Sequence, residues 1–265
     1  AMLAQMTTSG INGMVTAGGD KAIGATVTAV HEPSGTTYNT VVNESGRYSI
    51  NGMRVGGPYT VKVSYIGYTT SVTKDVTLQL AESYSLNVKL AEDANELGEV
   101  VVSAKATKFT AERTGASTNI NLRQLENMPT VSRSITDFTR LSPYGGNGMS
   151  FAGTDGRTAN FTVDGANFNN NFGLSDGLPG GGNPISIDAI EEMQVVISPY
   201  DVRQTNFIGG GVNAITKSGT NTFKGTAYIY HQNENMRGDA IEREQISGAR
   251  EKDQKTTYGF TLGGP

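Results

Sequence analysis

Hydrophobic and polar residues alternate with a period of two along the first third of the chain. In residues 61–65 and 86–90, valine, leucine and tyrosine alternate with lysine, serine and asparagine. Turn-forming clusters such as residues 43–46 divide these runs at intervals of roughly 8–12 residues, which is the spacing of a β-sandwich. No helical period is present in this stretch. We therefore expect an all-β, immunoglobulin-like sandwich over residues 11–91, preceded by a tail at residues 1–10.

The pattern breaks over residues 92–108. Residues 92–96 form a polar, acidic run that reads as a linker. A short segment with strong β propensity then follows around Val100, Val101 and Val102, between polar flanks. We expect this segment to be an extended strand in an otherwise polar connection.

Residues 109–221 mix short helices with strands. Ser134 to Asp137 matches a capping box, and Ile135, Phe138 and Leu141 are spaced to line one helix face. Asn121 is placed to cap a shorter helix that runs through Leu125. The pattern predicts two short helices here.

Strands interleave with these helices. Phe161 and Val163 alternate in a strand that ends at an Asp164-Gly165 turn. Residues 187–192 suggest one or two helical turns, which run into a buried strand at 193–197, and another strand is expected at 212–216. Interleaved strands and helices predict a small α/β domain over 109–221.

Two loops of this domain are long and rich in glycine and asparagine, at residues 144–156 and 167–183. Loops of this length in a compact domain are usually functional or mobile. They are therefore the first place to look for a ligand-facing surface.

The last stretch, residues 222–265, contains two further strands, at 222–231 and 256–262. In the second strand the large apolar residues Tyr258, Phe260 and Leu262 alternate with small or polar ones. This is the alternation of a membrane barrel strand. The connection at 232–255 is rich in charge, as expected of an outer-face loop, although an ordinary surface hairpin would also fit.

Composition narrows the function classes. The 265 residues carry a net charge of -4 and no cysteine, so nothing indicates nucleic-acid binding, a disulfide framework or thiolate chemistry. Residues 1–5 resemble a signal-peptide remnant with cleavage near Ala4, which favours export. No apolar run is long enough for a transmembrane helix, so a membrane contact would have to use β-strands.

Several segments together resemble TonB-dependent receptors of the Bacteroidetes type, in particular the Oar-like group. The resemblance covers nearly the whole chain and is carried by residues 160–165, 187–230 and 258–265. Residues 11–91 resemble the carboxypeptidase-regulatory-like domain that precedes the plug in many such receptors.

The resemblance implies an outer-membrane receptor that imports a scarce nutrient. Residues 109–221 would be the plug that gates the lumen, and residues 222–265 would be the first two strands of an incomplete barrel that needs about 22. Residues 1–108 would lie on the periplasmic side. The implied partners are the TonB C-terminal domain, the downstream β-barrel of the same protein and outer-membrane lipid, with a surface lipoprotein as a further candidate. No cofactor is implied.

The resemblance also suggests an energy-coupling site. The segment Glu99, Val100, Val101, Val102 and Ser103 resembles a TonB box, which a TonB sheet captures by strand addition. The alternative is that residues 100–102 are simply the first strand of the plug. Both interpretations stay open at this point.

Seven residues of the two long loops are candidates to face a ligand. They combine aromatic faces with amide donors and acceptors; they are Tyr144, Phe151, Phe168, Asn169, Asn170, Asn171 and Phe172. The alternative is a loop that lies in the lumen without touching a substrate.

No metal site or catalytic constellation emerges from the sequence. The spacing of Asp164 and Asp176 fits no EF-hand loop, and no G-x-S-x-G elbow is present. We therefore predict that the chain is not an enzyme. The competing function is an outer-membrane adhesion or signalling protein that uses the sandwich as its binding module.

Overall fold

A computed structural model describes residues 6–92, 100–103, 116–128, 130, 133–169, 178, 184–198, 209–236, 238, 240–241, 244–245 and 252–265. The chain divides into two compact units, Ala1–Ser218 and Gly219–Pro265. We describe each unit by itself.

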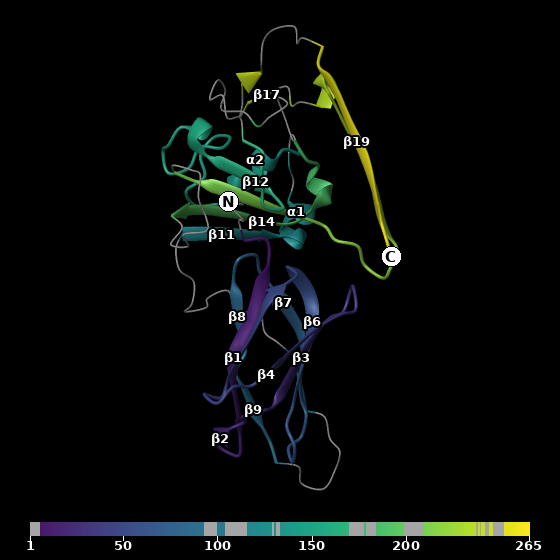
Figure 1. Cartoon of the computed structure of the whole chain (residues 1–265). Coiled ribbons are helices and arrows are strands. Elements are labelled where there is room, and N and C mark those ends of the chain that lie inside the picture. Colours follow the sequence, from purple (N-terminus) through teal and green to yellow (C-terminus); the bar gives the residue numbers. More distant parts are fainter. Residues whose placement is uncertain are drawn as a thin grey trace. The chain divides into compact units, whose positions relative to one another are not determined.

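The first unit begins with two β-sheets, whose strands are drawn in purple and blue in Figure 1. In the first sheet, β1 pairs with β2, β5, β8 and β9; in the second, the order is β10-β7-β6-β3-β4. The strands of the first sheet are β1 (Ser9–Ala17), β2 (Asp20–Lys21), β5 (Arg47–Met53), β8 (Ser83–Ser85) and β9 (Val88–Leu90). Those of the second are β3 (Thr26–His31), β4 (Thr36–Val41), β6 (Gly56–Ser64), β7 (Ser71–Leu78) and β10 (Val100–Ser103).

The two sheets bury their alternating apolar residues in one shared core. Val15 and Ile50 come from the first sheet, and Val27, Val61 and Leu78 come from the second. The period of two is what sends these side chains to the same face of each strand. Every regular element between Ser9 and Leu90 is a strand, which confirms the expectation of an all-β region.

A second core lies further along the chain, in the region that we call the central region (residues 116–216). Its sheet has the order β11-β14-β15-β12-β13, and several of these strands lie side by side in Figure 1. The strands are β11 (Ala116–Asn121), β12 (Asn160–Val163), β13 (Ala166–Asn167), β14 (Ile190–Ser198) and β15 (Gly211–Thr216). The helical elements are α1 (Leu122–Asn127), α2 (Ile135–Thr139), η1 (Gly156–Thr158) and η3 (Ile187–Ala189).

The predicted helix starts are confirmed. The Asn121 side chain accepts a bond from the Gln124 backbone N–H at 3.1 Å, and the Gln124 side chain accepts one from the Asn121 N–H. Ser134 and Asp137 form the second capping box. Each box supplies partners for backbone N–H groups that a helix leaves unpaired at its start.

The predicted turn after β12 is confirmed as well. Asp164 and Gly165 have φ angles of 49° and 80°, and positive φ at both central residues is what a type I′ hairpin turn requires. The Asp164 carboxylate also accepts bonds from the Thr216 N–H at 2.9 Å and from its hydroxyl at 2.7 Å. The turn is therefore joined to the end of β15.

Two predicted boundaries need correction. The helical turn expected over residues 187–192 covers only Ile187–Ala189, because β14 already pairs with β15 from Ile190 opposite Thr216. The helix of Ile135 ends at Thr139, so Leu141 lies beyond it and is 39% exposed. At the first boundary, strand pairing replaces the helical turn that the sequence pattern predicts. At the second, the helix ends two residues before Leu141.

The second unit is a long antiparallel hairpin of β16 (Lys224–Asn233) and β19 (Gln254–Gly263), with β19 labelled in Figure 1. Between these strands lie η4 (Glu234–Met236) and a small pair, β17 (Ala240–Ile241) with β18 (Glu244–Gln245). β16 therefore has the predicted length but begins two residues later than the sequence suggested, whereas β19 extends beyond the predicted strand at both ends.

The predicted alternation in β19 is confirmed. Tyr258, Phe260 and Leu262 are 78–81% exposed and share one face, while Thr257, Gly259 and Thr261 are less exposed on the other. The register extends the apolar face to β16, because Ile229 lies opposite Tyr258. On the opposite face the Thr226 and Thr261 hydroxyls bond to each other at 2.6 Å.

Among the described residues, none of the helices has the length and apolar character that crossing a membrane would demand.

Candidate functional site

Residues 100–103 form β10, which pairs in parallel with β7. Val100 lies opposite Ser71, and the register continues to Ser103 opposite Lys74. This pairing makes β10 the outermost strand of the sheet β10-β7-β6-β3-β4. Glu99, the first residue of the predicted TonB box, lies outside the described residues.

The position of β10 bears on the two interpretations of this segment. The alternative interpretation makes residues 100–102 the first strand of the plug, which would require pairing with the sheet of the central region. That sheet consists of β11, β14, β15, β12 and β13, and β10 belongs to the other sheet. Within the described residues, the segment is therefore an edge strand of the sheet β10-β7-β6-β3-β4, beside β7.

The described chain just before this segment is also held close to the start of β7. The Thr69 N–H donates to the Ala91 carbonyl at 2.9 Å, and Tyr68 forms an antiparallel bridge with Glu92. β7 begins soon afterwards at Ser71. Residues 91–92 and β10 therefore pair with adjacent parts of the chain, at residues 68–69 and 71–74.

The strand β7 has the surroundings of an interior strand. It pairs with β6 on one side and β10 on the other. Val72 is fully buried and Thr73 is 6% exposed, and these residues lie opposite Val101 and Val102. Without β10, the outer main-chain edge of β7 would lose its partner.

The first ligand-facing candidate loop, around residues 144–151, is a compact turn. The Ala152 N–H donates to the Tyr144 carbonyl at 2.9 Å, and the Gly146 N–H donates to the Ser150 carbonyl at 2.8 Å. Tyr144 is 53% exposed. Phe151 is fully buried in the core of the central region, and this corrects the expectation that its ring faces a ligand.

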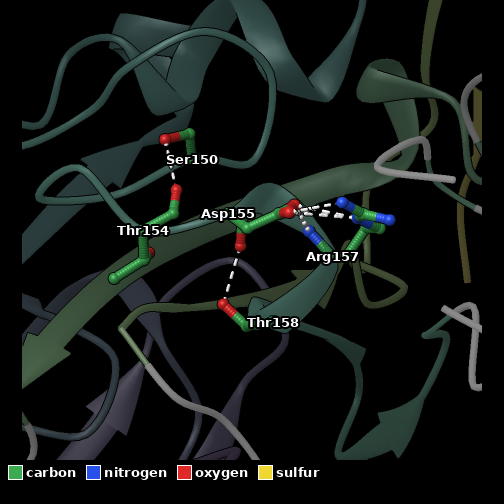
Figure 2. A network of polar contacts seen from close by, with 5 residues as sticks. All are labelled: Ser150, Thr154, Asp155, Arg157 and Thr158. Atoms are coloured by element: carbon green, nitrogen blue, oxygen red, sulfur yellow. Dashed lines mark hydrogen bonds and ion pairs between the residues drawn. The ribbon is translucent and has the colours of Figure 1, made fainter.

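A polar network continues this loop and is shown in Figure 2. The Asp155 carboxylate accepts bonds from the Arg157 backbone N–H at 3.0 Å and from its guanidinium at 2.7 Å. Its carbonyl accepts a bond from the Thr158 hydroxyl at 2.7 Å, and the Ser150 hydroxyl donates to the Thr154 carbonyl at 2.6 Å. The hydrogen bonds from Arg157 lower the pKa of Asp155 to about 2. The network fixes the shape of the loop.

In the second candidate loop, the structure describes Phe168 and Asn169; Asn170, Asn171 and Phe172 lie outside the described residues. Phe168 is 37% exposed and its ring makes an edge contact with Phe161.

The side-chain amide of Asn169 is hydrogen-bonded within the central region. Its side-chain oxygen accepts a bond from the Phe161 N–H, and its amide nitrogen donates to the Asn160 side chain at 2.6 Å. In the described part of this loop the Phe168 residue is thus partly exposed, while the Asn169 amide is hydrogen-bonded to residues of β12.

A set of residues that sequence reasoning missed forms the second face of the central sheet. Glu192, Gln194 and Asn213 alternate with core residues, yet they are only 2–5% exposed. The Leu80 N–H donates to Glu192 Oε1 at 3.0 Å, and Gln194 Nε2 donates to the Leu80 carbonyl at 3.1 Å. We call this set, with Asn119 and Thr162, the buried polar face.

Other contacts complete the buried polar face. Gln194 Nε2 also donates to Asn119 Oδ1 at 3.0 Å, the Thr162 hydroxyl donates to Asn213 Oδ1 at 3.0 Å, and Asn213 Nδ2 donates to the Met6 carbonyl at 2.9 Å. The alternation with apolar residues predicts a polar face. It does not predict burial, because the covering groups are the main chain at residues 6 and 80.

Among the described residues, no three histidine, aspartate or glutamate side chains gather where they could hold a metal ion. The His31 ring bonds the Ser34 hydroxyl at 2.6 Å and lies 4.8 Å from the Tyr59 ring. Burial lowers the pKa of His31, and the nearby Arg54 acts in the same direction. This histidine is a packed side chain of the N-terminal core.

Two family models match parts of the chain. Residues 10–91 match the carboxypeptidase regulatory-like domain, and residues 215–265 match an outer membrane beta barrel domain. The second match, on the hairpin with the exposed apolar face, confirms the predicted outer-membrane location.

Among curated proteins, the chain is similar to a TonB-dependent transporter Oar from Myxococcus xanthus. The two are 26% identical over 243 residues, which cover 85% of this chain and 22% of the relative. The chain thus spans about a fifth of the relative's length. The prediction that the chain is not an enzyme agrees with this transporter relative.

Similar solved structures cover only parts of the chain. A siderophore receptor PirA from Acinetobacter baumannii is 22% identical, with 57% of this chain and 22% of that chain covered at a TM-score of 0.40. A catechol 1,2-dioxygenase from Acinetobacter radioresistens is 15% identical, with 38% and 58% covered at a TM-score of 0.28. Both superpositions are too partial to support an argument.

Proposed function

We propose that this chain is the N-terminal part of a TonB-dependent outer-membrane receptor that imports a scarce nutrient. The observation that carries the proposal is the order of matches along one chain. A carboxypeptidase regulatory-like match is followed by an outer membrane barrel match, and similarity to a TonB-dependent transporter extends over 85% of the chain.

In this proposal the central region is the plug and the hairpin β16–β19 opens the barrel. The exposed apolar face of Tyr258, Phe260 and Leu262 would then meet lipid, as on the outside of a transmembrane barrel. A two-stranded sheet leaves unpaired backbone groups at its edges, so further strands of the same protein would have to complete the wall. The N-terminal sheets would lie on the periplasmic side, where TonB acts.

Residues 99–103 would be the segment that the TonB C-terminal domain captures. Strand addition needs a short extended segment whose main chain can be offered to a partner sheet, and residues 100–103 already take part in such pairing with β7.

A proline at the centre of the segment tests this role. Val101→Pro removes one N–H and fixes φ, so the full-length receptor should lose capture by the TonB C-terminal domain in a pull-down. Val101→Thr keeps the N–H and the branched side chain, and should still be captured. Unchanged capture of the proline variant would retire the assignment.

The loop residues Tyr144 and Phe168 are the described candidates for contact with the nutrient, together with Asn170, Asn171 and Phe172. Each described candidate exposes an aromatic ring. Phe168→Ala in the full-length receptor should lower the rate of growth on limiting nutrient roughly fivefold, since a stacked ring contributes on the order of 1 kcal/mol. Ile66→Ala, at an apolar residue that is 95% exposed and lies outside both candidate loops, is the control and should leave growth unchanged. Equal growth of both variants would favour a loop without substrate contact.

A further inference from the structure

We propose that a releasable latch joins the N-terminal region (residues 6–92) to the central region, and that it opens while both regions stay folded. The latch is the set of hydrogen bonds that the buried polar face makes with the main chain at residues 6 and 80. The inference goes beyond the proposed function, because it concerns contacts within the chain and requires neither TonB nor a nutrient.

The central region contributes a row of polar side chains that crosses four strands. Asn119 of β11 lies opposite Gln194 of β14, which in turn lies opposite Asn213 of β15. Thr162 of β12 lies opposite Asn213 and continues the row. Residues opposite each other in a ladder project to the same face of the sheet, so the row presents amide groups to the chain that covers it.

The N-terminal region contributes a turn that presents main-chain groups. The Glu82 N–H donates to the Gln79 carbonyl at 3.3 Å and closes a turn around Leu80. This bond uses neither peptide group of Leu80. The Leu80 N–H instead donates to Glu192 at 3.0 Å, and its carbonyl accepts from Gln194 at 3.1 Å.

Neighbouring strands add further bonds on either side of Gln194. Asn119 Nδ2 donates to the Leu80 carbonyl at 3.3 Å, and Asn213 Nδ2 donates to the Met6 carbonyl at 2.9 Å. Three adjacent strands of the central sheet, β11, β14 and β15, therefore each hold the N-terminal region through a side chain.

The latch differs from a hydrophobic core in what its opening exposes. The apolar side chains form two separate cores, one in the N-terminal region and one in the central region. The Leu80 side chain is fully buried and belongs to neither core. Apart from this side chain, the latch exposes polar groups on opening, and water can replace their hydrogen bonds. Its opening should therefore cost much less than unfolding either core.

One polar atom of the latch also disfavours the closed state. Gln194 Oε1 is buried, and among the described residues it has no hydrogen-bond partner. A buried acceptor without a partner has lost its hydration, which is unfavourable. Opening the latch restores that hydration and so lowers the free energy needed to separate the two regions.

The latch decides whether the two regions move together. While it is closed, a partner bound to the N-terminal region acts on β14 through Glu192 and Gln194. When it is open, the two regions move independently on the chain that connects them.

Hydrogen exchange of the full-length receptor, read residue by residue with mass spectrometry, tests the latch. The Leu80 amide donates across the latch, whereas the amides of Ala81 and Glu82 donate within the N-terminal region, to Thr8 and Gln79. We expect the Leu80 amide to exchange at least about tenfold faster than the paired amides of the interior strands β3 and β14, because local opening requires less free energy than global unfolding.

A charge variant should open the latch with little change in side-chain volume. Gln194→Glu replaces the donor that faces the Leu80 carbonyl with an acceptor. Exchange of the Leu80 amide should then rise by a further factor of about ten, while the amides of β3 and β14 keep their protection. Gln124→Glu is the matched control at an exposed position of α1. The Gln124 side chain accepts a bond there, so this variant should exchange like the unmodified receptor.

The distance between the two regions is a second measurement. Spin labels at Glu44→Cys and Arg123→Cys place one probe on an exposed residue of each region, and the 265 residues contain no other cysteine. Pulsed electron resonance of the full-length receptor should give a narrow distance distribution for the unmodified latch. The distribution should become broad in Gln194→Glu.

Two outcomes would overturn the inference. One is a Leu80 amide that exchanges as slowly in the unmodified receptor as the amides of β3 and β14, and this result requires no variant to fold. The other is a distance distribution that stays narrow in a folded Gln194→Glu receptor. Neither outcome concerns capture by the TonB C-terminal domain, so the proposed function is tested separately.

Discussion

The central sheet and the β16–β19 hairpin use the same alternation of apolar and polar residues, but with opposite burial. In the central sheet, Met193 and Val195 face the core while Glu192 and Gln194 are also buried, on the polar face. In the hairpin, Phe260 and its neighbours are among the most exposed apolar side chains that the structure describes. Alternation of apolar and polar residues with a period of two therefore indicates that a strand has two different faces. It does not indicate what covers each face.

This difference in burial shows which contacts stabilise each region. The central sheet is stabilised by apolar packing on one side and by hydrogen bonds with main-chain groups on the other. The hairpin is held by the backbone hydrogen bonds between β16 and β19, and few of its side chains are covered. Substitutions of the same kind should therefore have very different effects in the two regions.

The largest expected effect is the loss of a core ring. Phe161→Ala removes a side chain that is 1% exposed, and such truncations cost about 3–5 kcal/mol. Phe260→Ala removes an equal ring that is 81% exposed and should change stability by less than about 0.5 kcal/mol. Urea denaturation of the 265-residue chain measures both. Similar losses in the two variants would show that the hairpin ring is covered in solution.

A smaller effect is expected for the buried polar face. Gln194→Ala leaves the Leu80 carbonyl and Asn119 Oδ1 without this donor, which should cost about 1–3 kcal/mol. Gln254→Ala, at an exposed position of β19, is the matched change in the hairpin and should be neutral. The same urea titration applies, and a neutral Gln194→Ala would mean that water reaches this face.

The smallest effect concerns an exposed group whose pKa is shifted. Since the pKa of Asp155 is lowered from 3.8 to about 2, its contribution to stability is present above about pH 4 and is lost as the pH falls toward 2. Asp155→Asn should remove this part of the pH dependence, with a small change because the group is exposed. Carbon NMR of the Asp155 carboxyl group measures the pKa directly. A midpoint near 3.8 would show that the bonds from Arg157 do not persist in solution.

Local features of the fold were predictable because neighbouring residues determine them. Asn121 and Ser134 cap helices through residues three positions away, and the Asp164-Gly165 turn follows from the φ angles that these residues tolerate. The alternation in β19 also follows directly from the pleat of a strand.

Features that depend on distant partners were not predictable. The strong β propensity of Val100 to Val102 indicates a strand but not that its partner is β7, nor that the pairing is parallel. Burial of Glu192 depends on the main chain at Leu80, which is 112 positions away in the sequence. Within the candidate site, the extended segment at residues 100–103 was therefore predictable. Its pairing with β7, the burial of Phe151 and the hydrogen bonds of Asn169 were not.

The contact at Leu80 constrains how this protein can vary. Two hydrogen bonds of the buried polar face involve peptide groups of Leu80, whose N–H donates to Glu192 and whose carbonyl accepts from Gln194. Such bonds tolerate exchange of one apolar side chain for another of similar volume. They do not tolerate an inserted or deleted residue just after β7, which would displace the peptide groups along the chain. Homologues that keep these hydrogen bonds to Leu80 should conserve the number of residues just after β7 more strictly than the identity of those residues.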